Sequence, residues 1–228
     1  MVCSLLHFHN LVVCLQGEEI LMTDNCAITW EETDDPAALQ TNETVYLQYS
    51  RDPVRTPFQW DNTTSAGFSN TTGKTWLPMN ANFLTVNLAA QKAAEKSTFK
   101  LYQRLIKTRK DNHVLHMGDF KSKTLGDEVF AFTRTLKDHD SLAVFVNLGG
   151  AKNVSLKALL EEKDFNEAKR AKILIINNNS KLSVGGFVGN MEQIELGQYD
   201  AVVLEVSSAG KLAVSMLLIA FSLIKFIF

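Results

Sequence analysis

Arg55 is the residue whose surroundings are best suited to ligand chemistry. It lies in the stretch SRDPVRTPFQWD, between Pro53 and Pro57, and aromatic residues follow it closely. A guanidinium group held by a stiff loop can donate two hydrogen bonds to sugar hydroxyls or to a carboxylate, and the aromatic rings could stack on a sugar. The alternative is an ordinary loop salt bridge with Asp52 or Asp61, and the spacing alone favours that alternative.

Two other groups of titratable residues are less well placed for chemistry. The triplet Asp138-His139-Asp140 lies between two strand-like runs, where a hairpin turn is expected and adjacent side chains rarely converge. His7 and His9 could share one face of a strand as metal ligands, but no third ligand is within reach. The triplet is therefore interpreted as a turn, and we expect no metal site.

Paired carboxylates also fail to suggest a catalytic centre within this chain. The pairs Glu18-Glu19 and Glu31-Glu32 are adjacent in sequence, so their side chains diverge in either a helix or a strand. Cleavage of a glycosidic bond needs two carboxyl groups that face each other at about 5–9.5 Å. We therefore assign no catalytic residue to this chain.

The composition is that of an ordinary globular protein. The 228 residues carry 23 Lys and Arg against 25 Asp and Glu, with 46% apolar and 21% charged residues. These values exclude disorder, collagen and coiled coil, and a net charge of -2 provides no field that would attract nucleic acid. Three cysteines, Cys3, Cys14 and Cys26, are too few for a disulfide scaffold or a zinc module.

Periodicity divides the chain into two segments before its C-terminal tail. Residues 17–76 are rich in turn formers, prolines and aromatics, which predicts a long ordered loop of the kind that usually has a function. An amphipathic helix is predicted from Ser97, its N-cap, to Asn112. Six short alternating runs from Val114 onward predict an antiparallel β-sandwich. We expect a loop-and-helix part over 1–113 and a β-domain over 114–206.

The C-terminal tail is apolar. Residues 212–228 read LAVSMLLIAFSLIKFIF, and a 17-residue helix would span only about 26 Å. Small residues followed by an apolar terminus are typical of a glycosylphosphatidylinositol (GPI) attachment signal over 207–228, with Ser207, Ser208 and Ala209 as lipid attachment candidates. A retained membrane-spanning helix and a buried helix are the alternatives.

Asn-x-Ser/Thr sequons indicate the secretory pathway. The candidate glycosylation sites are Asn42, Asn62, Asn70, Asn153 and Asn178. Together with the tail, they predict a protein on the extracellular face of the plasma membrane. The first 16 residues form a poor signal peptide, because they lack a basic start and a small-residue cleavage site, and a truncated N-terminus would reconcile the two observations.

Several longer stretches resemble the α-glucosidases (maltases) of glycoside hydrolase family 13, and insect midgut maltases above all. These stretches are GEEILMTD, WEETDDPA and SRDPVRTPFQWDNTTSAGFSN, followed by TFKLYQRLIKTRK, GDEVFAFTRT and SLAVFVNLGG. The resemblance covers about residues 16–206. The stretch RTPFQW is specific, whereas GEEI alone would be weak. The first 15 residues depart from the family pattern.

The resemblance implies an α/β plus β fold, in which the end of a (β/α)8 barrel is followed by an antiparallel β-domain. Residues 1–113 would hold the last barrel strand, a long loop and the last barrel helix. Arg55 would line the pocket for the non-reducing glucose of maltose, sucrose or maltooligosaccharides, and Gly17 and Glu18 would have a positioning role at most. The family's nucleophile, its acid/base and its transition-state-stabilising carboxylate all precede GEEI, as does its calcium site where one occurs. We therefore expect no cofactor here, and no hydrolysis of α-glucosides by this chain alone.

Two non-catalytic interpretations compete with an α-glucosidase. The heavy subunits of amino-acid transporters resemble the same hydrolases, but they carry their membrane span at the N-terminus, whereas the apolar segment here is C-terminal. A carbohydrate-binding fragment is the other alternative. A barrel with one strand of eight cannot close, so an incomplete gene model or transcript is favoured over a purposeful short protein.

Overall fold

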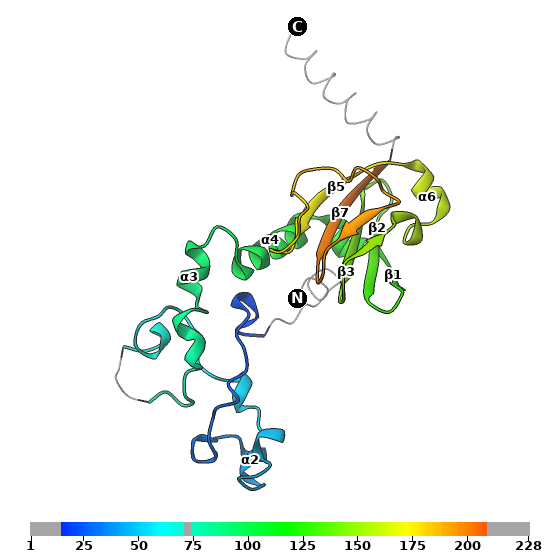
Figure 1. The fold of residues 1–228 in the computed structure, drawn as a ribbon. Helices are drawn as coiled ribbons and strands as arrows, with labels where there is room; N and C mark the ends of the chain where they lie inside the picture. The colour runs from blue at the N-terminus through cyan, green and yellow to red at the C-terminus, as the bar shows by residue number, and fades with distance from the viewer. Residues whose placement is uncertain (1–14, 71–73, 209–228) are drawn as a thin grey trace. The chain divides into compact units, whose positions relative to one another are not determined.

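The protein is described from a computed structural model, which defines residues 15–70 and 74–208 (Figure 1). The chain forms two compact units, and the boundary between them falls between Gln103 and Arg104, within helix α4 (Thr98–Asp111). The last barrel strand was expected within residues 1–113; residues 1–14 lie outside the described residues, and residues 15–70 and 74–118 contain no strand. The domain boundaries near residues 113 and 206 stay predictions.

The first unit consists of short turns and helices, as the prolines and turn formers of residues 17–76 predict. Its two short α-helices are α2 (Pro36–Leu39) and α3 (Leu88–Ala93). Single 3-10 turns lie at Glu18–Ile20, Trp30–Glu32, Tyr46–Gln48, Asp52–Val54, Thr64–Gly67 and Ala81–Leu84. A small core of Ile20, Phe58 and Leu88 joins three of these segments, with Met22 and Phe99 packed against it.

Side-chain caps determine where the helices begin. The Oγ atom of Ser97 accepts a hydrogen bond from the backbone N–H of Lys100 at 3.2 Å. Ser97 is therefore the N-cap of α4, as the sequence predicts. Gln91 joins this helix to the GEEI turn. Its Nε2 donates to the carbonyl of Ile20 at 2.6 Å, and its Oε1 accepts from the backbone N–H of Phe99 at 2.9 Å.

The second unit is a β-domain preceded by the end of α4 and by α5 (His113–Met117). Its main sheet is antiparallel throughout, in the order β1-β2-β3-β7-β5, and a second sheet pairs β4 with β6. The strands are β1 (Asp119–Leu125), β2 (Val129–Thr135), β3 (Ser141–Asn147), β4 (Lys152–Val154), β5 (Ala168–Ile176), β6 (Ile194–Leu196) and β7 (Ala201–Ser208). Helix α6 (Glu162–Glu167) precedes β5.

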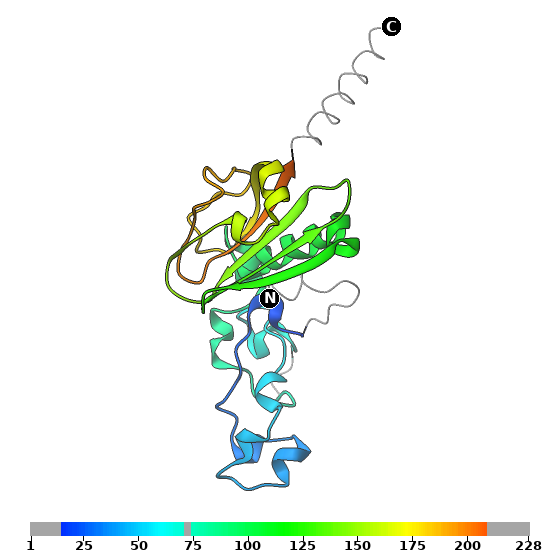
Figure 2. The same cartoon turned by 90° about the vertical axis from the view of Figure 1, so that its right-hand side faces the viewer.

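Alternation along β2 gives the main sheet two different faces. Val129 and Ala131 belong to a core cluster that includes Phe145 and residues of both sheets. This shared core makes the two sheets the predicted sandwich. The opposite face is buried too. Arg134 there is fully buried, and its Nη2 donates to the carbonyl of Leu115 in α5 at 2.9 Å. The second half of α4 lies beside β5, and Figure 2 shows the green helical segment against the sheet.

The structure corrects two details of the β-domain. One of the six alternating runs predicted as strands is AKNVSLKALL at residues 151–160, but only Lys152–Val154 is a strand, and Ser155 then caps a 3-10 turn at Leu156–Ala158. Strand β6 was not anticipated, because three residues give too little alternation to stand out.

Candidate functional site

The segment Arg51–Arg55 forms one wall of the candidate site. Asp52, Pro53 and Val54 make a 3-10 turn, and the backbone N–H of Arg55 donates to the carbonyl of Asp52 at 2.9 Å. Proline suits the first turn because its fixed φ matches and it has no N–H to leave unpaired. The carbonyl of Pro53 accepts from the backbone N–H of Asn25 at 2.9 Å. The turn is thus fixed from within and from a distant segment.

Two buried carboxylates hold the start of this segment. Asp52 is 3% exposed, and its Oδ2 accepts from the backbone N–H groups of Asp34 at 2.8 Å and Asp35 at 3.0 Å. Asp35, the N-cap of α2, forms a two-pronged pair with Arg51, with Nε to Oδ2 and Nη2 to Oδ1 both at 2.7 Å. The Arg51 backbone N–H also donates to Asp35 Oδ2 at 2.7 Å.

The pair between Arg51 and Asp35 is ionised. Hydrogen bonds from the Arg51 side chain and backbone hold the pKa of Asp35 far below its usual range, although burial opposes this. The same hydrogen bond raises the pKa of Arg51. Arg51 is therefore largely engaged by the protein itself and is not the residue that is left for a ligand.

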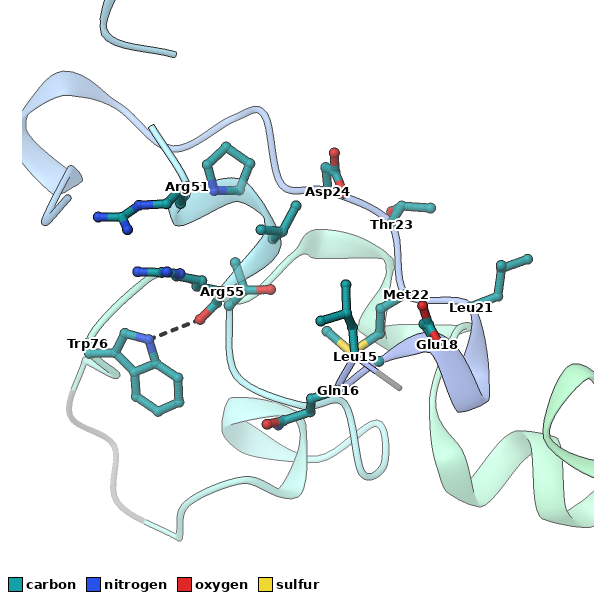
Figure 3. A pocket seen from close by; sticks show the side chains of 14 residues that line it. Leu15, Gln16, Glu18, Leu21, Met22, Thr23, Asp24, Arg51, Arg55 and Trp76 are labelled. Atoms are coloured by element: carbon teal, nitrogen blue, oxygen red, sulfur yellow. Dashed lines mark hydrogen bonds between the residues drawn. The ribbon is translucent and has the colours of Figure 1, made fainter. Parts of the chain in front are cut away.

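A cavity of about 630 Å³ lies beside this segment (Figure 3). Arg51, Arg55 and Trp76 line one part of it. Its lining is completed by Gly17 and Glu18 of the GEEI turn, by Leu21, Met22, Thr23 and Asp24 after it, and by Leu15, Gln16, Pro53, Val54 and Thr56. In Figure 3 the Arg55 and Trp76 side chains lie next to each other, apart from Leu15, Met22 and Glu18. Cationic, aromatic and carboxylate groups thus share one cavity.

Arg55 is exposed at this cavity and is not the loop salt bridge that the spacing favoured. Asp52 is taken by backbone N–H groups, and the carboxylate of Asp61 accepts from the backbone and hydroxyl of Thr63 at 2.8 and 2.5 Å. Within residues 15–70 and 74–208, the Arg55 guanidinium has neither a hydrogen bond nor an ion pair. Its donors are available to a ligand, but its role in binding stays a prediction.

The GEEI turn presents Glu18 to the same cavity. Gly17 has a φ of 100°, and a Cβ atom there would approach the Met22 side chain to 3.1 Å, so glycine is favoured on both grounds. The backbone N–H of Gly17 donates to Glu19 Oε2 at 2.7 Å, while Glu18 lines the cavity. The two carboxylates of the pair therefore serve different purposes, as their adjacency predicts.

Sequence reasoning missed two parts of this wall. The pair between Arg51 and Asp35 joins residues 16 positions apart, and spacing gives no signal for such a pair. In the sequence, Trp76 is only one of several aromatic residues in the loop over residues 17–76. In the structure its indole Nε1 donates to the carbonyl of Arg55 at 3.0 Å. A tryptophan in a loop rich in turn formers is the only signal that the sequence offers for this contact.

The remaining sequence candidates lie elsewhere. Asp138 has a φ of 65°, and the backbone N–H of His139 donates to the carbonyl of Leu136 at 3.1 Å, so the triplet is the predicted turn. His7 and His9 lie outside the described residues. In the part of the chain that the structure describes, no group of His, Cys, Asp and Glu could hold a metal ion. Cys26 is exposed and has no disulfide partner among those residues.

The predicted modification sites differ in accessibility. Asn42, Asn62, Asn70 and Asn153 are exposed, whereas Asn178 is half-buried. Their glycosylation stays a prediction.

Of the lipid attachment candidates, Ser207 is buried in β7, and its hydroxyl donates to Asp140 Oδ2 at 2.9 Å. Ser208 ends that strand. Ala209 and the apolar tail lie outside the described residues, and none of the helices within those residues is long and apolar enough to cross a membrane. Lipid attachment stays a prediction.

Comparisons with known proteins agree with the resemblance found in the sequence. Residues 1–118 match the family model described as alpha amylase, catalytic domain. An alpha-glucosidase of Apis mellifera is 34% identical over 196 residues, covering 86% of this chain and 33% of that protein. A glucan 1,6-alpha-glucosidase of Streptococcus pneumoniae is 31% identical, with 84% and 35% covered. The chain thus spans about a third of the length of these relatives.

Solved structures agree as well. A mutant isomaltulose synthase from Erwinia rhapontici NX5, solved in complex with D-glucose, superposes with a TM-score of 0.73 and 26% identity. The superposition covers 90% of this chain and 37% of that one. The predicted fold class is confirmed: these residues form the end of a barrel enzyme and the antiparallel β-domain that follows it.

Proposed function

Because the chain belongs to the alpha-amylase family of catalytic domains, glycoside hydrolase family 13, we propose that it is the C-terminal portion of an α-glucosidase. The complete enzyme would be a maltase that hydrolyses terminal α-1,4-glucosidic bonds with retention. Its substrates would be maltose, sucrose or maltooligosaccharides.

The observation that carries this proposal is the guanidinium of Arg55, which lines the cavity without a partner among the described residues. A charged donor with five N–H groups and no partner among the described residues is suited to several hydroxyl oxygens of one glucosyl ring. Trp76 adds an aromatic surface and Glu18 adds an acceptor. Such a mixture of an aromatic group with a few polar groups is typical of small-ligand sites.

Arg55 would bind the glucosyl unit but would not perform the chemistry. Retention requires a nucleophilic carboxylate and a protonated carboxyl on opposite sides of the glycosidic oxygen. A guanidinium stays protonated and is neither a base nor a nucleophile. The catalytic carboxylates would come from the portion of the enzyme that precedes this chain, so these 228 residues alone would hydrolyse no α-glucoside.

We also propose where the complete enzyme acts. A lipid anchor attached near Ser207, Ser208 or Ala209 would place it on the extracellular face of the plasma membrane. The apolar tail over 212–228 and the exposed sequons support this location.

The test is a substrate panel with the full-length protein, covering maltose, sucrose, maltotriose and the α-1,6-linked isomaltose. We expect glucose release from maltose, with the α-anomer detected first by proton NMR. Isomaltose as the preferred substrate would instead favour the specificity named for the pneumococcal relative. Absence of glucose release from all four sugars would favour a non-catalytic relative or a carbohydrate-binding protein.

A further inference from the structure

We propose that Trp76 is a positioning residue for Arg55. The indole Nε1 donates to the main-chain carbonyl of Arg55 at 3.0 Å and so fixes the peptide from which the guanidinium reaches the cavity. This inference rests on the proposed function, because it gives Trp76 a role only if Arg55 binds the glucoside.

The hydrogen bond from Trp76 also fixes the C-terminal end of the turn at Asp52–Val54. Asp52 and Pro53 are held by distant backbone N–H groups, and the Arg55 N–H is held within the turn. The carbonyl of Arg55 is the remaining polar group of its main chain. Among the described residues, the Trp76 indole is its sole hydrogen-bond donor. Loss of that donor would release the peptide plane that follows Arg55.

Trp76 is itself placed by its neighbours. Its ring meets the ring of Phe68 edge to face, with centroids 5.1 Å apart and an interplanar angle of 75°. The next residue, Leu77, is only 2% exposed, so its buried side chain holds this part of the loop in place. Trp76 nevertheless stays 52% exposed, so burial does not account for an indole at this position. The N–H contact of Trp76 and its place in the cavity wall account for the indole (Figure 3).

The test is a double-mutant cycle in the full-length enzyme with a chromogenic α-glucoside. Trp76→Phe keeps an aromatic ring against Phe68 but removes the N–H donor. A net hydrogen bond of ordinary strength corresponds to about 2- to 10-fold, so we expect KM to rise by that factor with kcat nearly unchanged. In the Arg55→Ala background, Trp76→Phe should add no further loss, because its effect acts through Arg55.

Trp60→Phe is the matched control. Trp60 is 48% exposed and also meets a phenylalanine edge to face, Phe58 at 4.9 Å. Its indole N–H has no partner within the residues that the structure defines. KM should therefore be unchanged in this variant. Should Trp76→Phe fail to fold, Phe68→Leu removes only the ring that supports the indole, and it should raise KM less, again only when Arg55 is present.

The outcomes separate this inference from the function on which it rests. A wild-type KM for Trp76→Phe, or a loss that adds in full to that of Arg55→Ala, would overturn the role of Trp76 and leave the proposed function standing. No effect of Arg55→Ala would overturn the roles of both Arg55 and Trp76, whereas absence of α-glucoside hydrolysis by the unmodified full-length protein would overturn the proposed function.

Discussion

At the residue scale, two arginines four positions apart have different tasks. Arg51 is engaged by Asp35 through two side-chain hydrogen bonds, whereas the guanidinium of Arg55 has no partner among the described residues. The buried carboxylates of Asp35 and Asp52 hold the chain in place. One arginine thus stabilises the wall of the cavity, and the other faces the cavity itself.

Replacement of Arg55 should impair the complete enzyme. A hydrogen bond from a charged group to substrate corresponds to about 10- to 150-fold, so Arg55→Ala should lower kcat/KM by that factor. Arg55→Lys should recover little, because an ammonium cannot reproduce the planar fork. Steady-state kinetics with a chromogenic α-glucoside measures both. An unchanged kcat/KM for Arg55→Ala would leave Arg55 as an ordinary loop residue.

The pair between Arg51 and Asp35 should make the fold sensitive to acid. Because folding lowers the pKa of Asp35, the ionised carboxylate stabilises the fold above its unfolded-state pKa of about 4. This stabilisation is lost as the pH falls through the lower folded-state pKa. Asp35→Asn should therefore lower the melting temperature at neutral pH and flatten its decline below about pH 4.

Circular dichroism melts of the 228-residue chain across this pH range measure the effect. Asp24→Asn is the control, since Asp24 is exposed and its carboxylate has no partner among the defined residues. An equally steep acid decline in Asp35→Asn and in the unmodified chain would contradict the assignment.

At the element scale, periodic elements were predictable and the site was not. The helix after Ser97 and most of the strands follow from alternation and capping, which are local properties of the chain. The contacts of Arg51 and Trp76 join positions 16 and 21 residues away, and only the folded loops bring them together. The motif RTPFQW located the wall of the cavity, but not the residues that hold Arg55 in place.

The core of the β-domain should be sensitive to cavities. Leu156 is fully buried in the cluster shared by both sheets, so Leu156→Ala should lower the free energy of unfolding by about 2–5 kcal/mol. Leu148 lies in the same domain but is 64% exposed, so Leu148→Ala should change it little. Urea unfolding followed by circular dichroism compares the two. Equal losses in both variants would contradict the core described here.

At the scale of the whole molecule, the chain contains a cavity wall and a β-domain, and it matches only part of its relatives. Its relatives are about three times as long as the matched part. In the proposed function, the site residues described here would bind and orient a glucoside, while the chemistry would depend on carboxylates outside the chain. Hydrolysis is therefore tested with the full-length protein, and stability with the 228-residue chain.

The apolar tail predicts a lipid anchor on the full-length protein. Phosphatidylinositol-specific phospholipase C should release it from cells, and the released protein should lack residues 212–228. Mass spectrometry of the released C-terminal peptide would identify the attachment residue. Retention on the membrane after treatment would favour a retained apolar helix instead.

The most direct test of the whole account compares α-glucosidase turnover by the purified 228-residue chain and by the full-length protein under identical conditions. We predict glucose release by the full-length protein and a rate no higher than buffer for the isolated chain, because the two opposed carboxyl groups that retention requires would lie outside it. Turnover by the isolated chain would contradict this account, and so would a folded full-length protein that hydrolyses no α-glucoside.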